Sequence, residues 1–175
     1  MTQTSCTSAL ISEEYRELNR TLHSSGCYGQ RGDRWSNAVQ LLIDKYEPQT
    51  ILDYGCGHGA LARHLGRHIA EYDPAIEGKE TLPEPAELVV CTDVIEHIEP
   101  ECIDQVLDHL QALTTKALFA VISTRPASKT LADGRNAHLI IEPWEWWEQK
   151  VRPRFNIEKI VVEPGEVRLV LTPRR

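Results

Sequence analysis

The sequence predicts one α/β domain, with a mainly parallel sheet, helices on both faces and an antiparallel hairpin at the C-terminus. The continuous apolar runs at residues 87–91 and 117–122 are typical of strands buried on both faces. Apolar residues recur at helical spacing between such runs, and this alternation of strands and helices indicates a parallel sheet. Pro164 and Gly165 mark a turn between the last two strands. A chain of 175 residues, 41% of them hydrophobic, suits a single domain.

The elements follow in a regular order. Residues 8–23 are expected to be helical, with Ser12 as a candidate N-cap. A second helix is expected to start at Asp33 and to end before Pro48. Pro100 suits the first turn of a later helix, and Pro143 opens a tryptophan-rich one. The remaining elements are strands at 50–53, 69–72, 155–162 and 167–171 and a helix at 60–68.

Charge and cysteine content narrow the class of protein. The formal net charge of -7 does not favour a wide nucleic-acid interface, which needs clustered Lys and Arg. The five cysteines are odd in number and form no CxxC pair, so we expect reduced thiols, with Cys56 and Cys91 in the core. We find neither a signal-peptide pattern nor an apolar run of membrane-spanning length. These features predict a cytoplasmic protein that does not enter a membrane.

A glycine-rich loop follows the first strand. Gly55, Gly57 and Gly59 alternate between a strand and a helix, where glycine allows tight turns and close approach of a ligand. Asp73 lies twenty residues after Asp53, at the end of the next strand, where an acid can accept hydrogen bonds from both ribose hydroxyls of a nucleoside. By itself, the loop could be a simple turn. A carboxylate at position 53 would repel a pyrophosphate and attract a cationic ligand.

Residues 51–59 resemble the first motif of the class I S-adenosylmethionine-dependent methyltransferases, Glu71–Pro74 their second motif, and 88–98 their fourth-strand motif. The resemblance implies a Rossmann-like three-layer sandwich. It also implies that the loop lies beneath the methionine part of the cofactor, that Asp53 lies near its ammonium group or a bound water, and that Asp73 holds the ribose. The cofactor-binding residues implied in this way are Asp53, Gly55, Cys56, Gly57, Gly59, Asp73, Thr92 and Asp93.

The chain departs from the family pattern after Asp73. Only fourteen residues separate Asp73 from Leu88, whereas the family normally places a helix, a strand and another helix there. A parallel crossover alone needs a dozen or more residues. We therefore predict that the third strand and its flanking helices are reduced or missing, and that the adenine side of the cofactor site is less enclosed.

A carboxylate and histidine cluster follows the fourth-strand motif. If a helical turn follows that strand, Asp93, Glu96 and His97 share one face, and His138 lies on the loop after the next strand. The pattern resembles that of metal-dependent O-methyltransferases acting on ubiquinone precursors or on the terminal ribose of small RNAs. A divalent metal bound by these four residues is possible, but we favour a metal-free site. His97 is then the preferred general base for a hydroxyl acceptor, and His138 the second candidate.

The loop at 125–138 is the candidate acceptor-recognition segment, since loops after strands often carry recognition. Arg135 and Asn136 could contact an anionic or sugar-like acceptor. Trp144 and Trp147 are three residues apart and are expected to pack in the core. The segment Tyr28–Arg31 could close over the cofactor.

The sequence thus predicts an S-adenosylmethionine-dependent methyltransferase that acts on an O- or N-nucleophile of a small-molecule, sugar or nucleoside acceptor. Two alternatives stay open: a metal-dependent RNA ribose O-methyltransferase, and a catalytically idle cofactor-binding or scaffold protein. We expect a single domain, with N-terminal helices and a lid loop at 1–47 and the Rossmann-like core at 48–175. The oligomeric state is open.

Overall fold

A computed structural model of the protein describes residues 9–24 and 32–175. Its centre is a six-stranded sheet in the order β2-β1-β3-β4-β6-β5. The strands β1 (Ile51–Tyr54), β2 (Ala70–Tyr72), β3 (Ala86–Thr92) and β4 (Thr114–Ser123) run parallel to one another. β6 (Glu166–Pro173) is antiparallel to β4 and pairs with β5 (Phe155–Glu163) in a hairpin. This is the predicted fold class, a Rossmann-like sheet with an antiparallel C-terminal hairpin.

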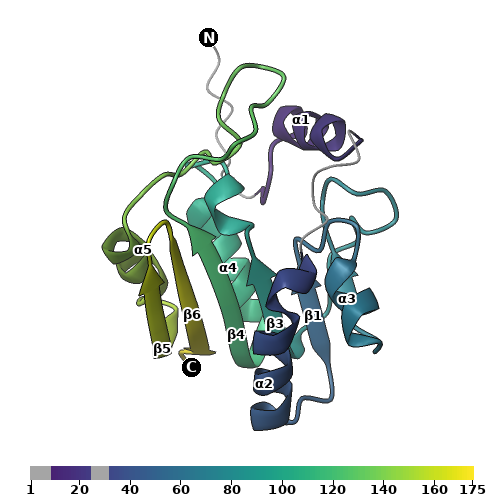
Figure 1. Ribbon diagram of the computed structural model, residues 1–175, viewed down its shortest axis with the longest axis vertical. Helices are drawn as coiled ribbons and strands as arrows, with labels where there is room; N and C mark the ends of the chain where they lie inside the picture. The colour runs from purple at the N-terminus through teal and green to yellow at the C-terminus, as the bar shows by residue number, and fades with distance from the viewer. Residues whose placement is uncertain (1–8, 25–31) are drawn as a thin grey trace.

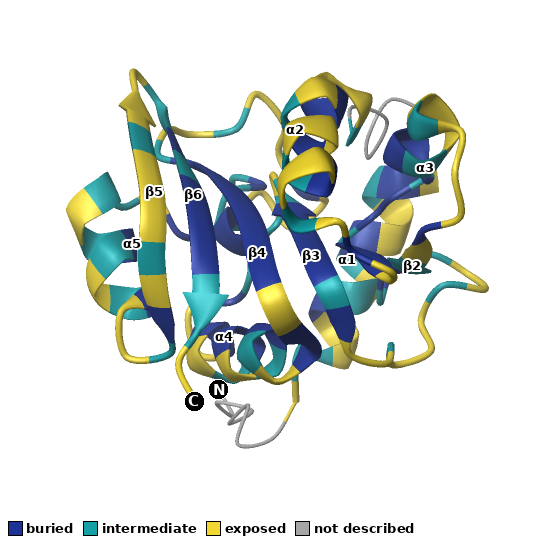
Figure 2. Cartoon of the chain, turned by 90° about the horizontal axis from the view of Figure 1, so that it is seen from below, coloured by how far each residue is buried: buried dark blue, intermediate teal, exposed yellow. Residues whose placement is uncertain are grey.

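Helices cover both faces of the sheet and give three layers (Figure 2). The helices α2 (Ser36–Tyr46) and α3 (Ala60–Leu65) pack on one face, over a cluster that includes Val39, Leu61 and Phe119. The helices α4 (Ile103–Leu113) and α5 (Trp144–Val151) pack on the other face, around a larger cluster that contains the fully buried Trp147. β3 and β4 are buried on both sides, which explains their continuous apolar sequence.

The segment between β2 and β3 is as short as its sequence predicts. No helix or strand occurs between Tyr72 and Ala86, and the chain crosses from β2 past β1 to β3 through turns and irregular structure. β2 is therefore the edge of the sheet, and the third strand of the family fold and its flanking helices are absent from this segment. The carboxyl ends of β1, β3 and β4 still lie side by side.

The starts of three helices differ from the sequence prediction. The first helix, α1 (Glu13–Ser24), begins only after Ser12, whose Oγ accepts a hydrogen bond from the Tyr15 backbone N–H at 3.1 Å. Residues 9–12 are not helical, because the cap stops the helix there. Pro100 lies outside α4, in the turn before Cys102, and does not occupy the first turn of the helix. A 3-10 turn, η1 (Gly32–Trp35), precedes α2 where a continuous helix was expected.

The cysteines correct one expectation. Cys56 and Cys91 are free and buried, as predicted, but Cys102 is disulfide-bonded. Cysteines that meet from distant parts of a chain leave no spacing signal in the sequence, so reduced thiols could not be inferred from the lack of a CxxC pair.

None of the helices in the described part of the chain has the length and apolar composition of a membrane-spanning segment.

Candidate functional site

A cavity of about 610 Å³ opens at the carboxyl ends of the parallel strands, a volume within the usual range for small-molecule sites. Its wall contains residues that follow β1, β2, β3 and β4, together with residues of α1 and η1. In Figure 1, α1 and the long loop after β4 stand above this end of the sheet. Of the eight predicted cofactor-binding residues, seven line the cavity: Asp53, Gly55, Cys56, Gly57, Asp73, Thr92 and Asp93.

The glycine loop has backbone conformations that favour glycine. Gly55 has φ +77°, and a Cβ atom there would lie 2.4 Å from a methyl carbon of Val94. Gly59, with φ +75°, does not line the cavity, and its missing Cβ leaves space for the Glu71 carboxylate instead. Gly59 therefore shapes the loop without facing the cavity, whereas Gly55 and Gly57 present backbone to it.

Asp73 joins the second strand to the glycine loop. Its two carboxylate oxygens accept hydrogen bonds from the backbone N–H groups of Gly57 at 3.0 Å and Ala75 at 2.9 Å. The side chain is buried yet lines the cavity. A carboxylate oxygen can accept more than one hydrogen bond, so Asp73 can hold the loop and still accept a ligand hydroxyl.

Asp53 is a buried acid of the cavity wall, and no residue in the described part of the chain forms an ion pair with it. Burial, together with the negative charge of Glu71, raises the pKa of Asp53 to about 7, while Lys79 opposes the shift. Lys79 is itself paired with Glu71 at 2.8 Å and donates to the Gly57 carbonyl at 3.2 Å. A cationic ligand next to Asp53 would stabilise the ionised form of this carboxyl. The site is therefore electrostatically suited to a compound that carries a sulfonium and an ammonium group.

The Asp93 side chain lies apart from the predicted four-residue cluster. Asp93 follows β3 in the left-handed region, with φ +55°, is exposed, and accepts a hydrogen bond from Trp35 Nε1 at 3.4 Å. The turn after it, η2 (Ile95–His97), begins two residues further on, so Asp93 lies outside the turn and its spacing of three does not place it on one face with Glu96. Asp93 lines the cavity next to Thr92, consistent with its predicted place in the cofactor site.

Glu96, His97 and His138 do come together. One ligand atom of each lies within 4.8 Å of the others, and the two imidazole rings meet edge to face with centroids 4.6 Å apart. Each ring places Nδ1 against a backbone carbonyl, His97 on Ala137 at 2.7 Å and His138 on Arg125 at 2.6 Å. In a neutral imidazole this arrangement puts the proton on Nδ1 and the lone pair on Nε2.

Glu96, the third member of this group, is fully buried. Its Oε1 accepts the Ser123 backbone N–H at 2.9 Å, whereas Oε2 has no hydrogen-bond partner in the described structure. Burial and the charge of Asp93 raise the pKa of Glu96 to about 8. Burial, helped by His138, lowers the pKa of His97 to about 3. The buried carboxyl of Glu96 and the neutral imidazole of His97 thus lie close to each other.

The first helix presents a polar face to the cavity. Its buried side chains are Tyr15, Asn19 and His23, spaced by four residues, and all three line the cavity. Two contacts hold the helix in place. Tyr15 Oη donates to the His97 carbonyl at 2.6 Å, and Ser12 donates from its backbone N–H and its hydroxyl to Glu99 at 2.8 and 2.6 Å. The predicted lid segment, 28–31, lies outside the described residues.

The loop after β4 corrects the predicted acceptor contacts. Arg135 pairs with Asp133 in its own turn at 2.6 Å and does not line the cavity. Asn136 does not line it either, because its amide is bound to both backbone groups of Ala127 at 2.9 Å. Both side chains are satisfied locally, as is usual for polar residues in turns. The tryptophans follow the prediction, since Trp147 is buried in the core and Trp144 packs against it.

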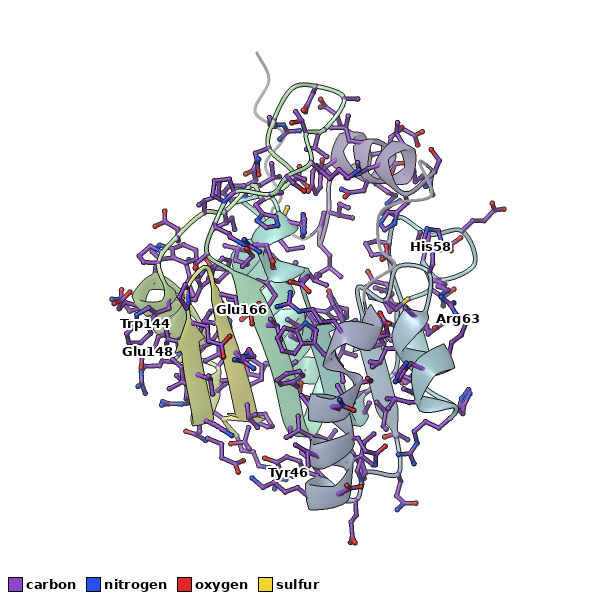
Figure 3. The ribbon with its side chains drawn as sticks, viewed as in Figure 1. Tyr46, His58, Arg63, Trp144, Glu148 and Glu166 are labelled. Atoms are coloured by element: carbon purple, nitrogen blue, oxygen red, sulfur yellow. The ribbon has the colours of Figure 1, made fainter. Side chains whose placement is uncertain are left out.

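Several cavity residues carry no motif in the sequence. Arg125 and Lys129 line the wall after β4, and Arg34 reaches it from η1. The polar residues Tyr15, Asn19 and His23 recur at helical spacing. This pattern could have predicted that α1 borders the site, because a helix that buries a polar face packs against a polar space. Figure 3 shows His58 above α3, toward one edge of the sheet, and Glu166 at the start of β6, toward the other.

The fold and the site together define a class I methyltransferase. A family model described as a methyltransferase domain matches residues 29–160, about three quarters of the chain. The chain belongs to this methyltransferase family, which confirms its predicted membership of the class I S-adenosylmethionine-dependent enzymes. No curated protein matches its sequence.

Solved structures share the fold at low sequence identity. The Burkholderia thailandensis 1,6-didemethyltoxoflavin-N1-methyltransferase, bound to 1,6-didemethyltoxoflavin and S-adenosylhomocysteine, is 13% identical with a TM-score of 0.67, and the match covers 93% of this chain and 90% of that one. The N-methyltransferase NodS of Bradyrhizobium japonicum, bound to S-adenosylhomocysteine, is 15% identical with a TM-score of 0.60, covering 94% and 100%. An Escherichia coli rRNA methylase is 15% identical with a TM-score of 0.51, covering 94% and 78%.

Proposed function

We propose that the protein transfers the methyl group of S-adenosylmethionine to a hydroxyl oxygen of a small-molecule, sugar or nucleoside acceptor. The observation that carries this proposal is the histidine pair in the cavity wall. His138 directs Nδ1 to the Arg125 carbonyl, which places the acceptor lone pair of its imidazole on Nε2, and the His97 ring lies beside it in the same wall. A hydroxyl nucleophile needs such an acceptor for its proton, whereas a neutral amine needs little help.

The cofactor is proposed to lie along the carboxyl ends of β2, β1 and β3. Asp73 accepts its ribose hydroxyls, and the backbone at Gly55 and Gly57 supports its methionine part. Asp53 lies near the ammonium group, and Thr92 and Asp93 flank the sulfonium. Asp53, Asp73 and Asp93 all line this side of the cavity, so their charge complements a cationic cofactor.

The reaction is an in-line displacement. The acceptor oxygen forms a bond to the methyl carbon while the bond from that carbon to sulfur breaks, and the sulfonium becomes a neutral thioether. The hydroxyl proton passes to an imidazole Nε2. Because burial lowers the pKa of His97 to about 3, His97 is a weak base, and it is better suited to orienting the hydroxyl. We therefore assign the proton transfer to His138, which reverses the order expected from the sequence.

Calorimetry with S-adenosylhomocysteine tests the cofactor assignment. We expect binding by the natural protein and binding at least tenfold weaker in Asp73→Asn. Glu77→Gln is the matched control, because Glu77 is an exposed acid on the same loop and does not line the cavity. The proposal fails if the natural protein does not bind the compound, or if Asp73→Asn binds it as tightly as the Glu77→Gln control.

A divalent metal at the histidine pair is the second candidate mechanism. Glu96, His97 and His138 offer one oxygen and two nitrogens within 4.8 Å, and Glu96 Oε2 is buried with no hydrogen-bond partner in the described structure. This donor set suits Zn²⁺, Mn²⁺ or Co²⁺, and the carbonyl contacts of both Nδ1 atoms are typical of metal-ligating histidines. A bound ion would lower the pKa of the acceptor hydroxyl. Asp93, the fourth ligand in the metal set considered from the sequence, is not part of this group.

Metal titration separates the two mechanisms. If an ion is required, Zn²⁺ or Mn²⁺ binds the natural protein, and the double variant His97→Ala/His138→Ala loses that binding while S-adenosylhomocysteine binding stays intact. Equal metal binding by the double variant, or full methyl transfer in the presence of a chelator, removes the metal mechanism.

A further inference from the structure

The charged residues of the cavity wall are divided by sign. The carboxylates are Asp73, Asp53 and Asp93, which follow or end β2, β1 and β3. The cations are Arg125 and Lys129, after β4, and Arg34, whose guanidinium reaches Glu166 on β6 at 3.0 Å. In the sheet order β2-β1-β3-β4-β6 the carboxylates therefore lie at one end of the cavity and the cations at the other.

The backbone around Arg125 is fixed by its neighbours. Thr124 donates to the Gly165 carbonyl at 3.0 Å, and His138 Nδ1 lies 2.6 Å from the Arg125 carbonyl. The Arg125 side chain lies across the β5–β6 turn. A Cβ atom at Gly165, which has φ +85°, would come within 2.8 Å of Arg125 Cδ. Glycine at this turn thus leaves the space that the arginine stem occupies.

Lys129 is also held through its backbone. Its carbonyl accepts the Ala137 N–H at 3.0 Å, and the two hydrogen bonds between Asn136 and Ala127 close the loop on the other side. Hydrogen bonds therefore fix the backbone positions from which both exposed cations extend. An ordered backbone lowers the conformational entropy that is lost when the side chains bind a ligand.

These two cations have no carboxylate partner in the described part of the chain. Arg125 and Lys129 form no ion pair with any described residue, whereas Arg34 is paired with Glu166 and Arg135 with Asp133. Both side chains are exposed, like other cations without an ion pair in the described part of the chain such as Arg67, but these two lie in the cavity wall next to the histidine pair, where an anionic ligand would complement them.

We infer that the acceptor carries an anionic group, a phosphate, sulfate or carboxylate, which Arg125 and Lys129 bind while its hydroxyl lies at the histidine pair. The inference rests on the proposed methyl transfer and specifies its substrate class. The guanidinium can make paired hydrogen bonds to two oxygens of such a group, and the ammonium adds a point charge. The acceptor hydroxyl is then directed at the cofactor by a contact on the opposite side of the molecule.

The experiment measures binding of inorganic phosphate and inorganic sulfate by calorimetry, with and without saturating S-adenosylhomocysteine. The test variant is Arg125→Gln/Lys129→Gln. Its matched control is Arg67→Gln/Lys159→Gln, which removes two exposed cations that do not line the cavity. We expect the natural protein and the control to bind phosphate equally, and the test variant to bind it at least fivefold more weakly.

Two results would overturn the inference: no binding of phosphate or sulfate by the natural protein, or equal binding by the test variant and the control. Cofactor binding is read in the same titrations, so a failure of the proposed function is recorded separately. A matched pair of hydroxyl probes, 3-hydroxybenzoate and 3-hydroxybenzamide, adds a second readout. Preference for the benzoate that disappears in the test variant supports the inference, and an unchanged preference contradicts it.

Discussion

The two ends of the cavity are built in different ways. The proposed cofactor end consists of three short stretches of chain, Asp53–Gly57, Asp73–Ala75 and Thr92–Asp93, and the first two are joined where Asp73 accepts a hydrogen bond from the Gly57 backbone N–H. The proposed acceptor end collects side chains from α1, η2 and the loop after β4, which lie far apart in the sequence. Backbone shape therefore dominates one end, and the convergence of distant side chains dominates the other. Substitutions should consequently act through conformation at the first end and through charge or hydrogen bonds at the second.

The largest expected effect tests the role of backbone shape. Gly55→Ala places a Cβ 2.4 Å from a Val94 methyl carbon at φ +77°, so the loop must move. We expect S-adenosylhomocysteine binding to weaken by about 100-fold, or about 2.7 kcal/mol, as measured by calorimetry. Gly78→Ala is the control, because Gly78 has φ +83° and its Cβ would meet no atom within 4 Å. Equal weakening in both variants would mean that strain in general, and not this loop, controls binding.

The next effect concerns the buried carboxyl at the acceptor end. The pKa of Glu96 is raised to about 8 in the folded protein, above its ordinary value, so its contribution to stability is complete below about pH 4.5 and is lost as the pH rises through 8. Between pH 7 and 9 the free energy of unfolding should fall by about 1.4 kcal/mol through this group. Chemical denaturation of metal-free protein at both pH values should show this fall, and Glu96→Gln should lack it.

The next prediction concerns Asp53, at the proposed cofactor end. Here a rise in pH is expected to strengthen cofactor binding, whereas at Glu96 it is expected to lower the free energy of unfolding. Since the pKa of Asp53 is raised to about 7 and a cationic ligand prefers the ionised form, affinity for S-adenosylmethionine should rise between pH 6 and 8, by up to about tenfold. Asp53→Asn should remove the part of this dependence that belongs to the protein. A titration series that gives the same pH profile for both proteins would rule out a contact between Asp53 and the cofactor.

The smallest effect concerns the attachment of α1. Tyr15→Phe removes the hydrogen bond to the His97 carbonyl, which is worth about 1 kcal/mol. Hydrogen exchange of the α1 amides should therefore accelerate by about fivefold. Tyr46→Phe removes the hydroxyl of a tyrosine that contacts Glu158 away from the cavity and is the control. If exchange in α1 is unchanged, other contacts hold this helix.

The contrast between the ends also explains how much the sequence could predict. The sequence predicted that Gly55 and Asp73 lie at the same site. This was possible because the carboxyl ends of parallel strands meet at one edge of the sheet, so the spacing of residues along the chain was sufficient. The short segment after Asp73 was equally readable, since fourteen residues could not form the missing strand and helices. Arg125 could not be separated from Arg135 by sequence, because only the structure distinguishes an arginine paired within its own turn from one in the cavity wall. The prediction that Asp93 shares a face with Glu96 and His97 was wrong, because Asp93 has a left-handed backbone and lies before the turn that holds the other two.

The shortened crossover has a consequence for association between copies of the protein. A long free edge strand is a template for intermolecular β-pairing and aggregation. Loss of the third strand makes β2 the edge, but β2 has only three residues and offers few backbone groups to a neighbouring chain. The opposite edge, β5, has nine residues, carries the exposed charges Glu158, Lys159 and Glu163, and has an irregular register at Ile157. Trimming the fold has thus removed one strand without creating an edge that favours fibril formation.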